Sequence, residues 1–385
     1  MRVYLDNSAT SWPKPHRVLE AISDYLNEYG GSPGRSGHSF ALRASREIFE
    51  TRELIAGLFN SKSSEKVVFT ANATHALNIA LKGILKKGDH VIVTSMEHNS
   101  MIRPLRYLEN QNLIQISIVN CDAEGKINTE DLTKNFKPNT KLVATIHGSN
   151  VTGTILPVRQ IGEICKAKSV LYLVDASQTA GIIPIDIQKD NIDILCFTGH
   201  KKLYGPPGIG GMCIKDDIVI DTLIHGGTGS KSEMETHPEF YPDRLEAGTG
   251  NTVGVVGLKA GIQYILEKGI DNLRKKQLQL VKYFVSQLSD MEDIIFYGPH
   301  MNEERLPLIS LNVKNMTPSD LAYELDNKFE IMVRAGLHCS PLAHKSIGTF
   351  PQGAVRFSVG GFNNERDIEY AADSLKKIII QNKKL

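Results

Sequence analysis

Residues Asn191–Gly211 read N-I-D-I-L-C-F-T-G-H-K-K-L-Y-G-P-P-G-I-G-G, and this stretch decides how the chain is interpreted. Its apolar run, Ile192–Phe197, has the length and composition of a buried strand. The sequence T-G-H-K-K and a Gly/Pro cluster follow, and they force the backbone into a tight loop. Burial of a lysine at such a strand end lowers its pKa, and the neutral amine is the form that attacks a carbonyl group. Taken alone, however, the loop favours a surface turn with two solvated lysines.

The composition is that of an ordinary globular protein, with 41% hydrophobic and 23% charged residues in 385. The 44 basic and 43 acidic residues give a net charge of +1, and no basic block stands out. This balance argues against nucleic acid or a membrane surface as the main partner. No apolar run is as long as a membrane span, and the first residues lack the apolar core of a signal peptide. The five cysteines are widely spaced and form no C-x-x-C pair, so we expect a protein of the reducing cytoplasm.

Strands and helices alternate from residue 66 to residue 197. Strands are expected at Lys66–Thr70, His90–Thr94, Leu113–Val119, Lys141–Ile146, Val170–Asp175 and Ile192–Phe197. Helices are expected between most of them, with one helix broken near Pro104. This alternation predicts an α/β fold in which a mostly parallel sheet is covered by helices on both faces.

The pattern changes near Val255, where two long helical stretches lead into further strands. The expected elements are helices at Val256–Glu267 and Asp271–Ser289, strands at Ile294–Tyr297, Leu306–Val313, Glu330–Val333 and Ala354–Val359, and a C-terminal helix from Asn364. We therefore expect a large domain of residues 15–255. The remaining residues, 256–385 together with an N-terminal arm of residues 1–14, are expected to form a smaller α+β domain.

Polar residues follow the ends of several predicted strands. Ligands of parallel sheets lie at the carboxyl ends of the strands, so these residues are expected to converge on one crevice. They are Thr74, His98, Asn150, Asp175 and Lys201.

Asp175 ends an apolar strand and admits three interpretations: a structural carboxylate, a magnesium ligand, or the partner of the protonated pyridine nitrogen of pyridoxal phosphate. Lys201, at the end of a neighbouring strand, favours the third. His98 is then expected to stack on the cofactor ring, although a histidine of this kind is more often structural. The groups expected to hold the cofactor phosphate are Ala73 and Thr74 at a helix start, and Thr198 and His200 beside the lysine.

The sequence does not support two other kinds of site, a nucleotide-binding loop and a zinc hydrolase centre. Gly226–Ser232 is similar to a nucleotide-binding loop, but Ser230 stands where that motif needs glycine. The twelve histidines include no H-E-x-x-H sequence, so no metal site is predicted.

Taken together, the motifs resemble the class V aminotransferase family of pyridoxal phosphate enzymes, most closely its cysteine desulfurase and selenocysteine lyase branch. The resemblance covers nearly the whole chain and keeps the family's order. The matching runs are Phe69–Thr74, Glu97–His98, Ser149–Thr154, Asp175–Gln178, Thr198–Lys201, Gly205–Gly210, Glu246–Thr249 and Arg334–Cys339. The resemblance implies a homodimer of fold-type I subunits.

The resemblance also implies roles around the cofactor ring. Lys201 would bind the cofactor covalently as a Schiff base, and Asp175 would pair with the pyridine nitrogen. Gln178 would contact the ring hydroxyl, while His98 would stack on the ring and move protons. Asn150 would also lie against the cofactor.

Further implied contacts include some that cross between subunits. Thr249 of the second subunit would join Ala73, Thr74, Thr198 and His200 at the phosphate. The substrate carboxylate would be bound by Asn150 and Arg356. The site would be completed across the dimer by Arg35 and His38.

The chain departs from the family pattern in having two lysines before Leu203-Tyr204-Gly205-Pro206. Counting from Gly199-His200 selects Lys201, whereas counting back from Tyr204 selects Lys202. We select Lys201, because the preceding strand fixes its geometry more tightly than the glycine loop would.

Cys339 lies in the polar sequence R-A-G-L-H-C-S-P, near an arginine and a histidine. A positive, loop-borne setting favours the thiolate, which is the nucleophilic form. The branch often has His-His-Cys where this chain has Leu337-His338-Cys339. The cysteines expected to be buried in the core are Cys121, Cys165, Cys196 and Cys213.

These features predict a pyridoxal 5'-phosphate-dependent cysteine desulfurase. It would convert L-cysteine to L-alanine, leave sulfur on Cys339 as a persulfide, and pass it to a protein acceptor. L-selenocysteine is an alternative substrate. The alternatives are an aminotransferase, epimerase or β-lyase that needs no protein thiol, and a scaffold protein that has lost catalysis.

Overall fold

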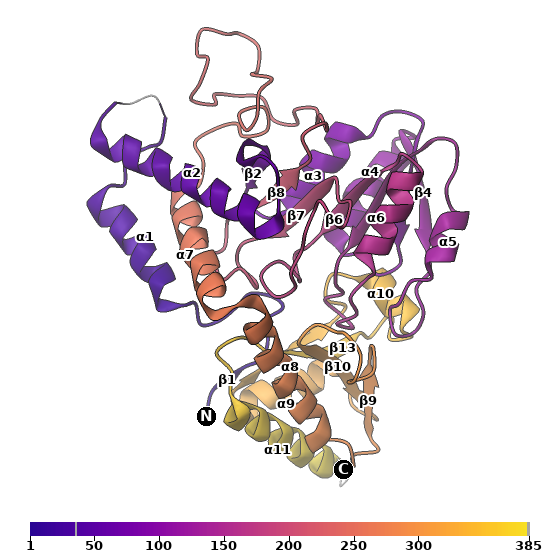
Figure 1. Cartoon of the computed structure of the whole chain (residues 1–385). Helices are drawn as coiled ribbons and strands as arrows, with labels where there is room; N and C mark the ends of the chain where they lie inside the picture. Colours follow the sequence, from indigo (N-terminus) through magenta and orange to yellow (C-terminus); the bar gives the residue numbers. More distant parts are fainter. Residues whose placement is uncertain (35–36, 383–385) are drawn as a thin grey trace.

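The computed structural model describes residues 1–34 and 37–382, and its centre is a seven-stranded sheet (Figure 1). The strands are, in spatial order, β2 (Val67–Thr70), β8 (Gly210–Ile214), β7 (Ile194–Thr198), β6 (Leu171–Asp175), β5 (Thr140–Ile146), β3 (Asp89–Thr94) and β4 (Ile114–Val119). Strand β8 is antiparallel to β2 and β7, and the other neighbouring strands are parallel. The predicted mostly parallel sheet is therefore confirmed.

Helices cover both faces of this sheet. They are α2 (Ser39–Phe59), α3 (Ala73–Ile84), α4 (Asn99–Asn110), α5 (Thr129–Lys134), α6 (Val158–Ala167) and α7 (Thr252–Lys268), with a 3-10 turn at Ser64–Lys66. Helix α1 (His16–Glu28) lies outside this layer and packs against α2 and α7. Alternate strand residues point to opposite faces. Thus Tyr172 and Val174 of β6 pack with α2, α6 and α7, whereas Leu173 packs with α3 and α4.

Helix α4 continues through Pro104, so the predicted break is wrong. A proline inside a helix costs about 3 kcal/mol, because it removes one hydrogen bond and crowds the preceding turn. Burial of Met101, Leu105 and Leu108 against the sheet offsets this cost.

The smaller domain is built on a four-stranded antiparallel sheet. Its strands are, in spatial order, β12 (Arg334–Gly336), β13 (Ala354–Ser358), β10 (Leu308–Val313) and β9 (Ile294–Tyr297). Its helices are α8 (Ile270–Gln287), α9 (Pro318–Phe329), α10 (Pro341–Ser346) and α11 (Glu365–Asn382). The N-terminal strand β1 (Val3–Tyr4) pairs in parallel with β11 (Ile331–Met332), so the arm joins this domain. Figure 1 shows β1 beside these helices.

The predicted domain boundary, between residues 255 and 256, falls inside α7. Leu258 and Ile262 of this helix are fully buried in the core of the large sheet. Gly261 permits the contact, since a Cβ atom there would lie 2.3 Å from the carbonyl oxygen of Leu203. We therefore infer that the division between the domains follows α7.

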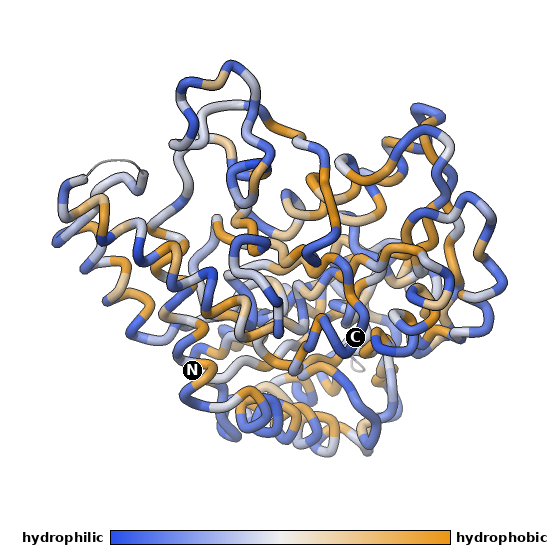
Figure 2. The backbone as a smooth tube through the Cα atoms, turned by 45° about the horizontal axis from the view of Figure 1, so that its top comes forward, coloured by the Kyte–Doolittle hydropathy of each residue, from blue (hydrophilic) through white to orange (hydrophobic). Residues whose placement is uncertain are grey.

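Large apolar side chains remain exposed on α1 and α2, the outlying helices that carry hydrophobic stretches in Figure 2. They are Leu19, Leu26, Phe40, Leu42 and Phe49. Within the described ranges, none of the helices combines the length and hydropathy that crossing a membrane requires.

Candidate active site

A cavity of about 430 Å³ lies at the carboxyl ends of the central strands. This volume is within the range of pockets that hold small ligands. The lining includes all five residues that follow the predicted strand ends: Thr74, His98, Asn150, Asp175 and Lys201. The small domain closes the cavity with residues of β12, β13 and the loop after β12.

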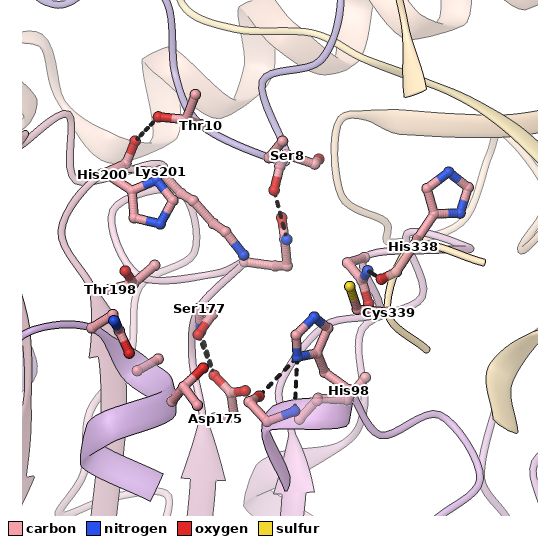
Figure 3. A pocket seen from close by; sticks show the side chains of 18 of the residues that line it. Ser8, Thr10, His98, Asp175, Ser177, Thr198, His200, Lys201, His338 and Cys339 are labelled. Carbon is pink, nitrogen blue, oxygen red and sulfur yellow. Dashed lines mark hydrogen bonds between the residues drawn. The ribbon is translucent and has the colours of Figure 1, made fainter. Parts of the chain in front are cut away.

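Lys201 follows β7, and its side chain points into the cavity (Figure 3). Among the described residues, its amine has no hydrogen-bond partner. Burial lowers the pKa of Lys201 to about 8, although the carboxylate of Asp175 opposes the shift. At pH 7 roughly one such amine in ten is neutral, against about one in 3,000 for an ordinary lysine. Lys201 is therefore suited to covalent bonding with a carbonyl carbon.

Lys202 points away from the cavity into the contact between the domains. Its Nζ donates to Gln277 Oε1 on α8 and to the carbonyl oxygen of Val359, both at 2.8 Å. These contacts engage its amine, so the geometry supports Lys201 over Lys202 as the cofactor-binding lysine.

Asp175 ends β6 and is buried at the floor of the cavity. Its Oδ1 accepts hydrogen bonds from the backbone N–H, at 2.9 Å, and the hydroxyl of Ser177. These bonds fix the carboxylate and do not use Oδ2. Gln178 also lines the cavity, and its Nε2 donates to the carbonyl oxygen of Ser8 at 3.0 Å.

His98 caps the N-terminus of α4. Its Nδ1 accepts from the backbone N–H of Ser100 at 3.1 Å and bonds the Ser100 hydroxyl at 2.8 Å. Burial and the charge of Lys201 lower the pKa of His98 to about 4, so the ring is neutral at pH 7. Because Nδ1 is the acceptor, the ring proton is assigned to Nε2, the nitrogen that faces the cavity in Figure 3.

One end of the cavity is suited to an anion. Ala73 and Thr74 lie in the first turn of α3, which is capped by Asn72, and free N–H groups at such a terminus favour phosphate. The Thr198 hydroxyl is buried and has no partner among the described residues. Burial lowers the pKa of His200 to about 4, so this ring is also neutral at pH 7.

Arg356 of β13 is buried where the two domains meet. It donates to Asp6 Oδ1 at 2.8 Å and to the carbonyl oxygen of Asn150 at 3.0 Å. Its Nε has no partner among the described residues. The Asn150 side chain is instead engaged, since its Nδ2 donates to the carbonyl oxygen of His338 at 2.8 Å. Arg356 therefore keeps one donor without a partner, whereas the Asn150 side chain is bound to the loop that carries Cys339.

Cys339 lies in the loop after β12, is exposed, and directs its sulfur toward the same cavity as Lys201 (Figure 3). The other four cysteines are buried, as predicted. Burial raises the pKa of Cys121 and Cys165 to about 12 and that of Cys196 and Cys213 well above the ordinary value.

Three predicted site residues are not among those that line this cavity. Arg35 lies outside the described residues. His38 caps the exposed start of α2, and Thr249 is exposed in the loop before α7. Their predicted roles require a second subunit.

The N-terminal arm also contributes to the cavity, although its sequence predicts no site role. Ser8, Ala9 and Thr10 nevertheless line the cavity, and the Thr10 hydroxyl donates to the carbonyl oxygen of His200 at 3.0 Å. The small polar residues of Asp6–Thr10, D-N-S-A-T, are the sequence feature that could indicate a site role for the arm. They do not indicate which loop the arm contacts.

Comparison with known proteins identifies the family. The model of the family described as Aminotransferase class-V matches residues 3–371, and the chain belongs to this family. A probable cysteine desulfurase of Pyrococcus abyssi is 35% identical, over 98% of this chain and 94% of that protein.

Two solved structures are similar over almost their whole length. The apo structure of a cysteine desulfurase from Thermococcus onnurineus has a TM-score of 0.91 and 32% identity, covering 100% of this chain and 95% of that one. The cysteine desulfurase CsdA from Escherichia coli has a TM-score of 0.88 and 25% identity, covering 99% and 95%. These similarities confirm the predicted fold class.

Enzymes of this family use pyridoxal 5'-phosphate, and this is the cofactor of the chain. The residues present fit it. The Lys201 amine is free to bond its aldehyde carbon, and the buried Thr198 hydroxyl beside the start of α3 lacks a partner that a phosphate oxygen would supply. Asp175 provides a carboxylate for the ring nitrogen.

The two adjacent lysines give a direct test. After borohydride reduction of the cofactor-loaded protein, peptide mass spectrometry should find the cofactor on Lys201. Lys202→Met should keep this label, and Lys201→Ala should lose it, because Lys202 points away from the cavity. A label on Lys202 in the unaltered protein would contradict the assignment.

The lowered pKa of Lys201 predicts how cofactor binding depends on pH. Since only the neutral amine reacts, the rate at which cofactor-free protein takes up pyridoxal 5'-phosphate should rise with pH and level off above about 8. Absorbance of the bound cofactor measures this rate. The same reaction with N-acetyl-lysine methyl ester is the control and should keep rising toward the ordinary lysine pKa of about 10.4. A protein profile that follows this control would show that burial does not activate Lys201.

Proposed function

We propose that this chain is a cysteine desulfurase that converts L-cysteine to L-alanine and takes the sulfur onto Cys339 as a persulfide. The observation that carries the proposal is that one exposed thiol faces the same cavity as the reactive amine of Lys201. Relatives of similar length that are named cysteine desulfurases support it.

The cofactor would be bound by Lys201 and positioned by the carboxylate of Asp175, with His98 against its ring and Gln178 near its hydroxyl. Its phosphate would lie at the start of α3 beside Thr198 and His200. When bound, pyridoxal 5'-phosphate withdraws electrons from the substrate and so stabilises negative charge on carbon.

The chain's own residues supply substrate binding and proton transfer. Arg356, with its free Nε, binds the carboxylate of L-cysteine. The neutral Lys201 amine accepts the proton of the substrate Cα, and His98 can donate a proton from Nε2. Asp6 holds the Arg356 guanidinium in place during these steps.

Sulfur transfer follows from the position of Cys339. Its thiolate attacks the substrate sulfur, so a sulfur–sulfur bond forms while the substrate Cβ–sulfur bond breaks. The released electron pair stays with Cβ, and a proton completes the methyl group of alanine. The products are alanine and a persulfide, so no external oxidant or reductant is needed.

The fate of the sulfur and the location of the enzyme are parts of the same proposal. The persulfide would be passed to a protein acceptor. The same attack would release selenium from L-selenocysteine, because selenium occupies the position of sulfur. A nucleophilic thiol must remain reduced, so we place the enzyme in the cytoplasm.

We also propose that the active unit is a homodimer. Exposed leucine and phenylalanine side chains on α1 and α2 provide apolar surface for a second copy. Thr249 and His38 are exposed on their own chain, as residues that serve a neighbouring subunit would be.

Cys339→Ala should retain the bound cofactor but lose at least about 99% of alanine formation from L-cysteine, because the nucleophile is absent. Amino-acid analysis measures the alanine, and absorbance measures the cofactor. Cys165→Ala is the control, since Cys165 is buried in α6 and should not alter the reaction. Normal alanine formation by Cys339→Ala would rule out the proposed nucleophile.

Sedimentation of the cofactor-loaded protein should give the mass of two chains. Phe49→Glu, which places a charge on the exposed face of α2, should shift the equilibrium toward single chains. Glu163→Lys, on the exposed surface of α6, changes charge away from α1, α2 and the loop that carries Thr249, and should leave the equilibrium unchanged. A single-chain mass at micromolar concentration would contradict the dimer.

A further inference from the structure

The loop that carries Cys339 has an unfavourable backbone conformation. His338 and Cys339 have φ values of 49° and 56°, so two successive residues with side chains occupy the left-handed region. Such a conformation persists only where the surroundings hold it. The direction of the Cys339 sulfur therefore depends on the contacts that fix this loop.

Two residues of the large domain, Asn99 and Asn150, make such contacts. The backbone N–H of Asn99, at the start of α4, donates to the carbonyl oxygen of Cys339 at 2.7 Å. Asn150 holds both flanking residues: its Nδ2 donates to the His338 carbonyl at 2.8 Å, and its Oδ1 accepts from the Ser340 hydroxyl at 2.9 Å.

A further contact comes from α10. His338 and His344 are stacked, with ring centroids 5.3 Å apart, and His344 is fully buried. His338 Nδ1 and His344 Nε2 are 3.1 Å apart, and His344 Nδ1 lies 2.7 Å from the Thr349 hydroxyl. His338 Nε2 lies 3.2 Å from the carbonyl oxygen of Arg334.

These hydrogen bonds form a series from Thr349 through His344 and His338 to the carbonyl oxygen of Arg334. The direction of each bond follows from this carbonyl oxygen at the end of the series. The carbonyl oxygen of Arg334 can only accept, so His338 Nε2 carries the proton. Burial lowers the pKa of both histidines, so both rings are neutral. His338 Nδ1 must then accept from His344 Nε2, and His344 Nδ1 must accept from Thr349.

We propose that His344 is a positioning residue for sulfur transfer, which acts through His338 to hold the Cys339 sulfur toward the cavity. His344 is not among the residues that line the cavity, so it would influence the nucleophile without touching substrate or cofactor. This inference rests on the proposed role of Cys339.

Two substitutions separate positioning from general stability. In His344→Gln the side-chain amide reaches the position of Nε2 and can still donate to His338. In His344→Asn the amide reaches only the position of Nδ1, so it keeps the contact with Thr349 and loses the one with His338. Both remove the same buried ring.

His344→Asn should lower kcat for alanine formation by about 10- to 100-fold, with little change in KM or cofactor content, because the nucleophile is misplaced. Alkylation of Cys339 by iodoacetamide, followed by peptide mass spectrometry, should become faster as the loop is released. His344→Gln should stay within about threefold of the unaltered enzyme in both measurements. Equal losses in the two variants, or no loss in His344→Asn, would overturn the proposal.

If His344→Asn does not fold, Thr349→Val supplies the test. It keeps both histidines but removes the donor that fixes the proton on His344 Nε2. A lower kcat at unchanged KM, restored by Thr349→Ser, is expected, and an unchanged kcat would overturn the proposal. Normal alanine formation by Cys339→Ala would instead refute the proposed function and this inference with it. An inactive Cys339→Ala beside an unaffected His344→Asn would refute only the inference.

Discussion

The parallel pairing of β6 with β7 is the constraint on which the site depends. Its register places Asp175, the last residue of β6, opposite Cys196, so Lys201 leaves the sheet just beyond that carboxylate. Parallel strands of this kind are buried on both faces, which is why the amine at their end has lost much of its hydration. The same burial that stabilises the sheet therefore shifts the pKa of Lys201 toward the neutral form.

The second requirement is that the two domains meet over these strand ends. Asp6 of the N-terminal arm accepts hydrogen bonds from Arg356 at 2.8 Å and from Arg334 at 2.9 Å. These bonds hold the arm against the small domain beside the cavity. Lys202 adds a buried contact from the large domain to α8. Arg356 and Cys339, the proposed substrate-binding arginine and nucleophile, are thus held on one domain against Lys201, the proposed cofactor-binding lysine, on the other. Residues of both domains therefore line the cavity.

Much of the large domain is predictable from the sequence, because buried parallel strands are short apolar runs and the polar residues after them meet at one edge. Strand β8 gives no such signal, since it starts with Gly210 and Gly211 directly after a Gly/Pro cluster. Both glycines are needed there, because a Cβ atom would lie 2.7 Å from the carbonyl oxygen of Phe197 or 2.6 Å from that of Val68. The contacts of the N-terminal arm join residues that are distant in sequence. The pairing of His338 with His344 follows no periodic pattern. Such contacts are set by tertiary structure and become visible only in the fold.

The central claim is that a protein thiol in this cavity receives the sulfur of L-cysteine. Peptide mass spectrometry after brief incubation of the cofactor-loaded protein with L-cysteine tests it most directly. The account predicts one added sulfur atom on the peptide that contains Cys339, with alanine released in equal amount. Consumption of L-cysteine with an unmodified Cys339 peptide would contradict it and would indicate a reaction, such as transamination or β-elimination, that needs no protein thiol.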